Sequence, residues 1–137
     1  MKKLTLVMIA AILVMFLGCS KSSDSPTSPS TTSPVAGTWN MASENGVPLS
    51  GFTMTIVINN DGTWTYTTTG ATSSIGAPCT GSGTSSTSGS NLTIVTTAEN
   101  CPDTGETYPN TEINTYTVTA TTLTMTTTGK ITVFTKQ

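Results

Sequence analysis

The strongest constraint on the fold is a strict alternation of apolar and polar residues on both sides of one turn. It is seen in "FTMTIVINNDGTWTYTTT". Alternation with a period of two predicts strands, because successive side chains of a strand point to opposite faces. A three-residue Asn-Asp-Gly turn that ends at a left-handed Gly62 pairs Ile58 with Trp64 and Ile56 with Tyr66. All the large apolar side chains then lie on one face, so the turn and the pattern agree.

The same pattern continues through the rest of the chain. In "TYTVTATTLTMT" a tight turn pairs Val118 with Leu123 and Tyr116 with Met125. A turn over residues 128–130 then pairs Met125 with Val133. The expected strands are 37–44, 52–59, 63–70, 80–88, 91–99, 112–119, 122–128 and 131–136. We predict an all-β fold, a single antiparallel up-and-down barrel of about eight short strands, because closure removes exposed strand edges.

The apolar positions of these strands form the predicted core. They are Trp39, Met41, Phe52, Met54, Ile56, Ile58, Trp64, Tyr66, Leu92, Ile94, Tyr116, Val118, Leu123, Met125, Ile131 and Val133. A barrel of this size either fills with its own side chains or encloses one small ligand. Both readings stay open, and the filled barrel is the one we expect.

Two cysteines lie symmetrically about a turn-like Gly-Ser-Asn. A hairpin centred on Ser90 places Cys79 opposite Cys101, and the same register pairs Ser88 with Leu92 and Ser86 with Ile94. Facing strand positions supply the Cα separation that a disulfide needs. We therefore predict a Cys79–Cys101 disulfide, with two free thiols as the alternative.

The first residues have the layout of an export signal. A basic head, Met1 to Lys3, precedes an apolar run over 4–17, which is shorter than the roughly 20 residues of a membrane-spanning helix. The run ends in "FLGCS", which resembles the lipobox of bacterial lipoproteins. The resemblance implies a signal peptide over 1–18 and a Cys19 that carries diacylglycerol and an N-linked acyl chain such as palmitate. The alternative is a chance cysteine behind a membrane anchor.

The segment that follows resembles a tether. Residues 19–36 contain the lipidated Cys19 and then mainly Ser, Thr and Pro, which bury too little to become ordered. The folded domain is expected over 37–137. The predicted location is the cell envelope, reached by export and held by the lipid anchor. Ser20, where an Asp would retain a Gram-negative lipoprotein at the inner membrane, favours the outer membrane.

Composition excludes several classes of function. Charged residues make up 9% of the chain, and five lysines are its only basic residues. Phosphate binding needs clustered Lys and Arg, so no nucleic acid partner is expected. The chain has no histidine, which removes the histidine-based catalytic and zinc sites. We expect no enzyme activity, no cofactor and no metal. The acidic loop over 99–112 is read as solvated, with calcium binding as the alternative.

The domain resembles the lipocalin-like domains of small bacterial lipoproteins. The resemblance rests on "VAGTWNMASENG", "TMTIVINNDGTWTYT" and "NTYTVTATTLTMT", with Gly37, Trp39, Asp61, Gly62, Tyr116, Val118 and Leu123 at the motif positions. It implies a calycin-type barrel in which Trp39 plugs one end. Lipocalins stack a late arginine over that Trp, and this chain has no arginine.

Two functions follow as hypotheses. In the first, the barrel binds a small apolar ligand, and the residues expected to contact it are Trp64, Tyr66, Met54, Tyr116 and Met125. In the second, the barrel is filled and the protein acts by surface contact with an envelope or host protein, as an enzyme inhibitor, an adhesin or an assembly component.

Overall fold

The computed structural model describes residues 32–70, 78–101 and 105–137. Within them lie β1 (Gly37–Glu44), β2 (Val47–Pro48), β3 (Phe52–Ile58), β4 (Thr63–Gly70), β5 (Thr80–Ser88), β6 (Asn91–Glu99), β7 (Asn110–Val118), β8 (Thr122–Thr127) and β9 (Lys130–Lys136). The fold is all-β, as the alternation predicts. None of the described residues belongs to a helix long and apolar enough to cross a membrane. The predicted signal peptide and Cys19 lie outside the described residues.

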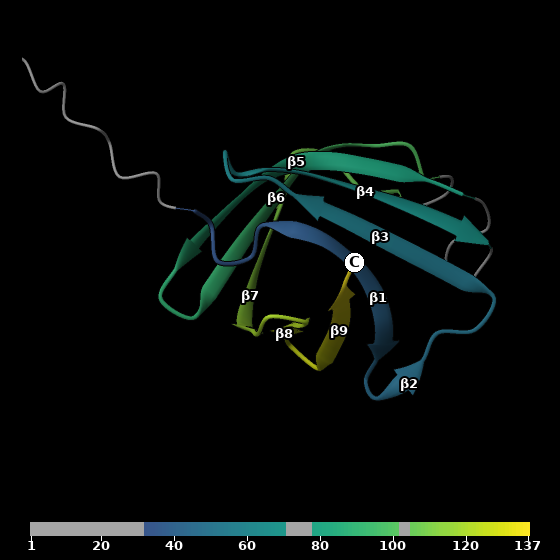
Figure 1. Cartoon of the computed structure of the whole chain (residues 1–137). Coiled ribbons are helices and arrows are strands. Elements are labelled where there is room, and N and C mark those ends of the chain that lie inside the picture. The colour runs from purple at the N-terminus through teal and green to yellow at the C-terminus, as the bar shows by residue number, and fades with distance from the viewer. Residues whose placement is uncertain (1–31, 71–77, 102–104) are drawn as a thin grey trace, which may run out of the picture. The chain divides into compact units, whose positions relative to one another are not determined.

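The strands form a closed antiparallel barrel (Figure 1). From β3 to β9 each strand pairs with the next in sequence, and β1 closes the ring by pairing with both β3 and β9. The short β2 is an addition that pairs with the end of β1 alone. Closure leaves the eight long strands with a hydrogen-bonded neighbour on each side, which removes the edges that favour aggregation.

The two ends of the barrel differ. One end carries the start of β1 and the tight turns that follow β3, β5 and β7. Trp39 and Val35 are fully buried there, and the Trp39 Nε1 donates a hydrogen bond to the Val35 carbonyl at 2.9 Å. Val35 falls in the segment that the sequence assigns to the tether, so the packed part of the chain begins before residue 37. The other end carries the β1–β2 turn and the β8–β9 turn, and we call it the mouth.

The predicted β3–β4 and β7–β8 registers are confirmed. Ile58 pairs with Trp64 and Ile56 with Tyr66, across a turn in which Gly62 has a φ of 83°. Across the second hairpin, Val118 pairs with Leu123 and Tyr116 with Met125. In both hairpins the turn residues and the apolar pattern demand the same pairing, and no long-range contact is needed to choose it.

The predicted register of the β5–β6 hairpin is wrong next to its turn. The turn has two residues, so Thr87 pairs with Leu92 and Ser85 with Ile94, instead of Ser88 and Ser86. Gly89, the first turn residue, has a φ of 58°, which suits a type II′ turn. A β-bulge further along β6 adds one residue and shifts the register back.

The predicted β8–β9 register is also wrong. A two-residue turn pairs Met125 with Thr132 and Leu123 with Phe134. Phe134 and Thr132 therefore face the interior, and Val133 does not. Ile131 is 47% exposed. The run "ITVF" offers apolar residues on both faces, and the larger side chain is the one that is buried.

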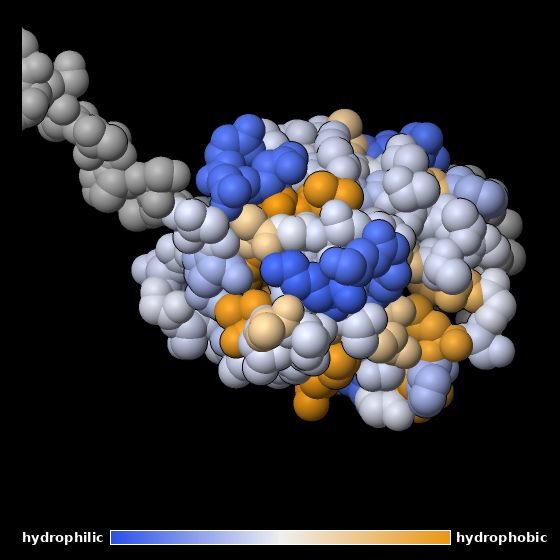
Figure 2. Space-filling view, in the orientation of Figure 1, coloured by the Kyte–Doolittle hydropathy of each residue, from blue (hydrophilic) through white to orange (hydrophobic). Residues whose placement is uncertain are grey.

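The outer face is rich in threonine and serine from alternate strand positions. Figure 2 accordingly shows a mostly pale surface on which the hydrophobic and the strongly hydrophilic areas are separate patches. The apolar residues that alternate with these threonines point inward, so the interior of the barrel holds most of the apolar surface that a ligand could contact.

Candidate ligand site inside the barrel

The barrel is not filled by its own side chains. A cavity of about 720 Å³ runs inward from the mouth. Its apolar lining comes from strands all around the barrel and comprises Met41, Phe52, Met54, Ile56, Ile58, Trp64, Tyr66, Ile94, Leu123, Met125 and Phe134, with Val47 and Pro48 of β2 and the following Leu49. Small-molecule sites in proteins are mostly apolar and measure about 300–1,000 Å³, so this cavity has the size and lining of one.

Trp64 and Tyr66 form an aromatic wall on β4. Their rings stack with centroids 5.8 Å apart and an angle of 11° between the planes. The glycines of β5 provide the space, because a Cβ at Gly81 would lie 2.3 Å from the Tyr66 ring and one at Gly83 would lie 3.0 Å from the Trp64 Nε1. The Trp64 Nε1 donates to the Thr84 carbonyl at 3.1 Å, which orients the indole.

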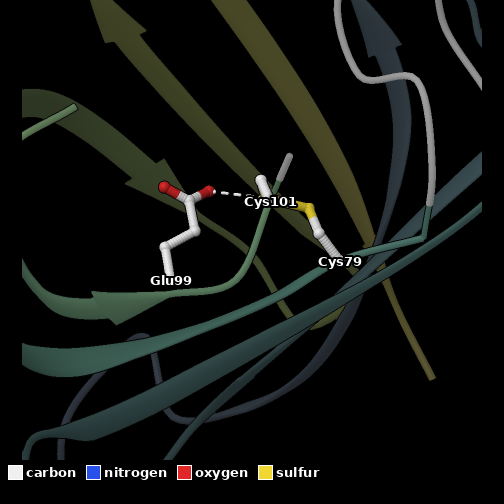
Figure 3. A group of neighbouring side chains, drawn as sticks. All are labelled: Cys79, Glu99 and Cys101. Carbon is white, nitrogen blue, oxygen red and sulfur yellow. Dashed lines mark hydrogen bonds between the residues drawn. A yellow bond between two sulfur atoms is a disulfide. The ribbon is translucent and has the colours of Figure 1, made fainter. Parts of the chain in front are cut away.

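The predicted Cys79–Cys101 disulfide is confirmed, with Cα atoms 4.7 Å apart. The tyrosine hydroxyl of the aromatic wall reaches it, since the Tyr66 Oη lies 3.0 Å from the Cys101 Sγ. Figure 3 shows Glu99 turned toward the same bridge, with its Oε1 2.9 Å from the Cys101 Sγ. Both sulfurs are used by the disulfide, so Cys79, Glu99 and Cys101 do not make a metal site.

The β-bulge in β6 accounts for the orientation of Glu99. Leu92, Ile94 and Thr96 alternate onto the inner face, and simple alternation would turn Glu99 outward. The additional residue reverses the alternation, so Glu99 lines the cavity. The Tyr108 hydroxyl donates a hydrogen bond to the Glu99 Oε2 and fixes the carboxylate at the mouth.

Charged side chains line the mouth. They are Glu44, Glu99, Glu112 and Lys130. The Lys130 Nζ lies 3.1 Å from the Glu44 Oε2, an ion pair between partly exposed side chains. Acidic groups therefore outnumber basic ones among the described residues of the mouth.

One side-chain amide lies deep in the cavity. Asn114 lines it, is 3% exposed, and pairs across β6–β7 with Leu92, which is fully buried. Among the residues that the structure describes, its Nδ2 is the one buried side-chain nitrogen or oxygen without a hydrogen-bond partner. Thr68, by contrast, is also buried but accepts a hydrogen bond from the Cys79 amide at 2.9 Å.

The structure brings together most of the residues expected to contact a ligand. Trp64, Tyr66, Met54 and Met125 line the cavity. Tyr116 does not belong to the lining; it is partly buried and packs against the core near the closed end. Trp39 is fully buried at that same end and does not reach the cavity.

Sequence reasoning missed Asn114, Thr132 and Phe134. Asn114 follows from the pattern already used, since it lies two residues before Tyr116 on the same face of one strand. It was missed because only apolar residues were assigned to the interior. Thr132 and Phe134 were missed because the β8–β9 turn was assigned three residues instead of two.

Comparison with solved structures supports the assignment of the fold. A lipocalin-like protein from Bacteroides uniformis ATCC 8492 is similar with a TM-score of 0.56 and 13% identity, over 77% of this chain and 100% of that one. A protein from Bacteroides eggerthii DSM 20697 is similar with a TM-score of 0.53 and 12% identity, over 74% and 98%. No family model and no curated protein sequence matches the chain. The folded part of the chain thus has a lipocalin-like β-barrel fold, with a largely apolar cavity in its interior.

Proposed function

We propose that this protein is a lipid-anchored lipoprotein of the cell envelope, without enzyme activity, that binds a small and largely apolar ligand inside its barrel. The observation that supports ligand binding is the cavity of about 720 Å³ with its largely apolar walls. Burying apolar ligand surface there contributes about 25 cal/mol per Å², and the open mouth provides a way in.

The cavity favours this function over the alternative of a filled barrel that acts by surface contact. That alternative requires the inward side chains to occupy the interior. The small residues on the cavity wall, which include Thr68, Ser85, Thr96 and Thr132, argue against it because larger side chains at these positions would fill the space. The lack of histidine in the whole chain supports a non-enzymatic role.

The lipid anchor is proposed from the sequence, and one structural feature supports it. The disulfide takes up Cys79 and Cys101, which leaves Cys19 as the one cysteine of the chain for lipidation. Disulfides form and persist in exported proteins and are rare in the cytosol. The outer membrane is the proposed location in a Gram-negative cell.

Ligand binding is tested with N-phenyl-1-naphthylamine, an uncharged apolar dye whose fluorescence rises in an apolar site. We expect saturable binding of one dye per protein, with energy transfer from tryptophan because Trp64 lines the cavity. A fluorescence increase that never saturates, or none at all, would contradict a site inside the barrel.

The anchor is tested with Cys19→Ala in cells that are fed labelled palmitate. We expect the variant to lose the label and to leave the membrane fraction. The double variant Cys79→Ala/Cys101→Ala is the matched control and should keep the label. If Cys19→Ala fractionates with membranes as the unmodified protein does, the lipoprotein assignment is wrong.

A further inference from the structure

Besides the hydroxyl groups on its wall, the cavity has an amide and several carboxylates, which lie at different depths and differ in charge. An amide, that of Asn114, lies deep among apolar residues. Carboxylates lie at the mouth, and β7 carries both kinds on one face, Glu112 near its start and Asn114 two residues further in. A ligand that fills the cavity meets both sets, so together they restrict its chemistry.

The nitrogen of the deep amide lacks a partner among the described residues. The Nδ2 of Asn114 donates no hydrogen bond to any of them, and the residue is only 3% exposed. Leaving a buried donor unpaired costs about 1–3 kcal/mol. Leu92 lies opposite Asn114 in the register and offers no acceptor in its side chain. Asn114 lines the cavity, so a rotation of its amide would bring the Nδ2 within reach of an oxygen carried by a ligand, and that hydrogen bond would remove this cost.

The mouth disfavours a negative charge. Lys130 is already paired with Glu44, and no lysine of the described residues forms an ion pair with Glu99 or Glu112. The other lysine of the described residues, Lys136, is at the opposite end, 5.2 Å from the centre of the Trp39 ring. A ligand with a carboxylate or phosphate at the mouth would lose its hydration and be repelled by like charges.

From these two observations we propose that the barrel selects an apolar ligand that has a neutral hydrogen-bond acceptor in its buried part and no negative charge. A ketone, ester or amide oxygen accepts from the Asn114 Nδ2, and the end at the mouth is uncharged or cationic. Anionic amphiphiles such as free fatty acids bind more weakly than uncharged or cationic ones of the same length. This inference deepens the proposed function and rests on it.

The deep contact is tested by displacing N-phenyl-1-naphthylamine with 2-decanone and with decane, two probes of equal length. We expect 2-decanone to bind about threefold to tenfold more tightly, the effect of one hydrogen bond to a buried donor. Asn114→Leu, which keeps a similar side-chain volume, should abolish this preference, so that 2-decanone no longer binds more tightly than decane. The melting temperature of Asn114→Leu should not fall, because the change removes an unpaired buried group.

The effect of the mouth is tested with decanoate and decyltrimethylammonium. We expect decanoate to bind on the order of fivefold or more weakly at low salt, about the effect of one unit-charge repulsion near 4 Å in water. The double variant Glu99→Gln/Glu112→Gln should bring the two affinities together, and added salt should do the same. In this variant 2-decanone should still bind more tightly than decane, because the deep amide is unaltered.

The outcomes separate this inference from the proposed function. If neither the dye nor any decyl probe binds, the proposed function fails. If the dye binds but 2-decanone and decane bind equally to the unmodified protein, Asn114 is merely hydrated in the cavity and the inference is wrong. It is also wrong if decanoate binds as well as decyltrimethylammonium. These two comparisons use the unmodified protein, so they hold even if Asn114→Leu does not fold.

Discussion

The Nζ of Lys136 lies 5.2 Å from the centre of the Trp39 ring, where the lipocalin resemblance implies an arginine. The last strand thus supplies a cation to the Trp near the start of β1. The neighbouring Gly37 makes room, because a Cβ there would lie 3.0 Å from the Lys136 Cε. The closed end of the barrel therefore combines a buried indole, a glycine and a lysine from the two ends of the domain.

Replacing this lysine should destabilise the barrel modestly. We expect Lys136→Met to lower the free energy of unfolding by about 0.5–1 kcal/mol, the usual contribution of an exposed cation–π contact. Lys136→Arg should keep or exceed the original stability, since a guanidinium also stacks on an indole. Urea unfolding followed by fluorescence measures both. Equal loss in the Met and Arg variants would show that the charge does not matter.

Filling the cavity should remove ligand binding without unfolding the protein. Thr132 lines the cavity, and Thr135 on the same strand is exposed. We expect Thr132→Phe to place its ring in the empty space and reduce dye binding at least about tenfold, while Thr135→Phe binds as before. Circular dichroism checks that both variants fold. Undiminished binding to Thr132→Phe would place the dye outside the barrel.

The glycines of β5 should tolerate alanine unequally. A Cβ at Gly83 would lie 1.8 Å from the Val95 carbonyl oxygen, a backbone atom, whereas at Gly81 the obstacle is the Tyr66 side chain. We expect Gly83→Ala to lower stability by about 1–3 kcal/mol or more, as overpacking does, and Gly81→Ala to cost less. Thermal unfolding measures the loss of stability in the two variants. A smaller effect at Gly83 would contradict the close approach of β5 and β6.

The disulfide should contribute substantially to stability. Because it closes a loop of 22 residues, we expect Cys79→Ala/Cys101→Ala to lower the free energy of unfolding by about 3 kcal/mol. Reduction of the unmodified protein should have a similar effect, and reduction of the double variant should have none. A reductant that destabilises both proteins equally would act elsewhere.

The β3–β4 turn should contribute to acid sensitivity. The Thr63 hydroxyl, and then the Thr63 backbone N–H, hold the pKa of the Asp61 carboxyl below its ordinary value. A lowered folded-state pKa gives stability that is present above the unfolded value, about 3.9, and is lost as the pH falls through the folded value. We therefore expect the melting temperature of Asp61→Asn to fall less below pH 4 than that of the unmodified protein. Parallel curves would contradict this role.

Local sequence determined the registers of two hairpins correctly because two signals agreed in each. Around Gly62 the turn type and the apolar alternation both demand the pairing of Ile58 with Trp64. The β8–β9 hairpin lacked that agreement. Its turn suits either two or three residues, and "ITVF" is apolar on both faces, so the pairing of Leu123 with Phe134 depends on which side chain the closed barrel can bury.

The disulfide shows a correct result reached through an incorrect local register. The β5–β6 pairing near the turn is one residue away from the one expected, yet Cys79 and Cys101 meet because the bulge in β6 restores the count. A bulge leaves little trace in a run of threonines, where both faces carry the same residue. The orientation of Glu99 toward the cavity depends on the same bulge and could not be predicted for the same reason.

The sequence by itself determined the class of the fold and most strand positions, because alternation and turn residues act over short distances. The tertiary structure alone decided that the barrel has a cavity and that Asn114 lies unpaired within it. Closing the sheet sets the width of the interior, and the glycines of β5 and the threonines of the inner face leave that width unfilled. Whether the interior is filled depends on how side chains from all the strands meet, and this cannot be read from the sequence of any one strand.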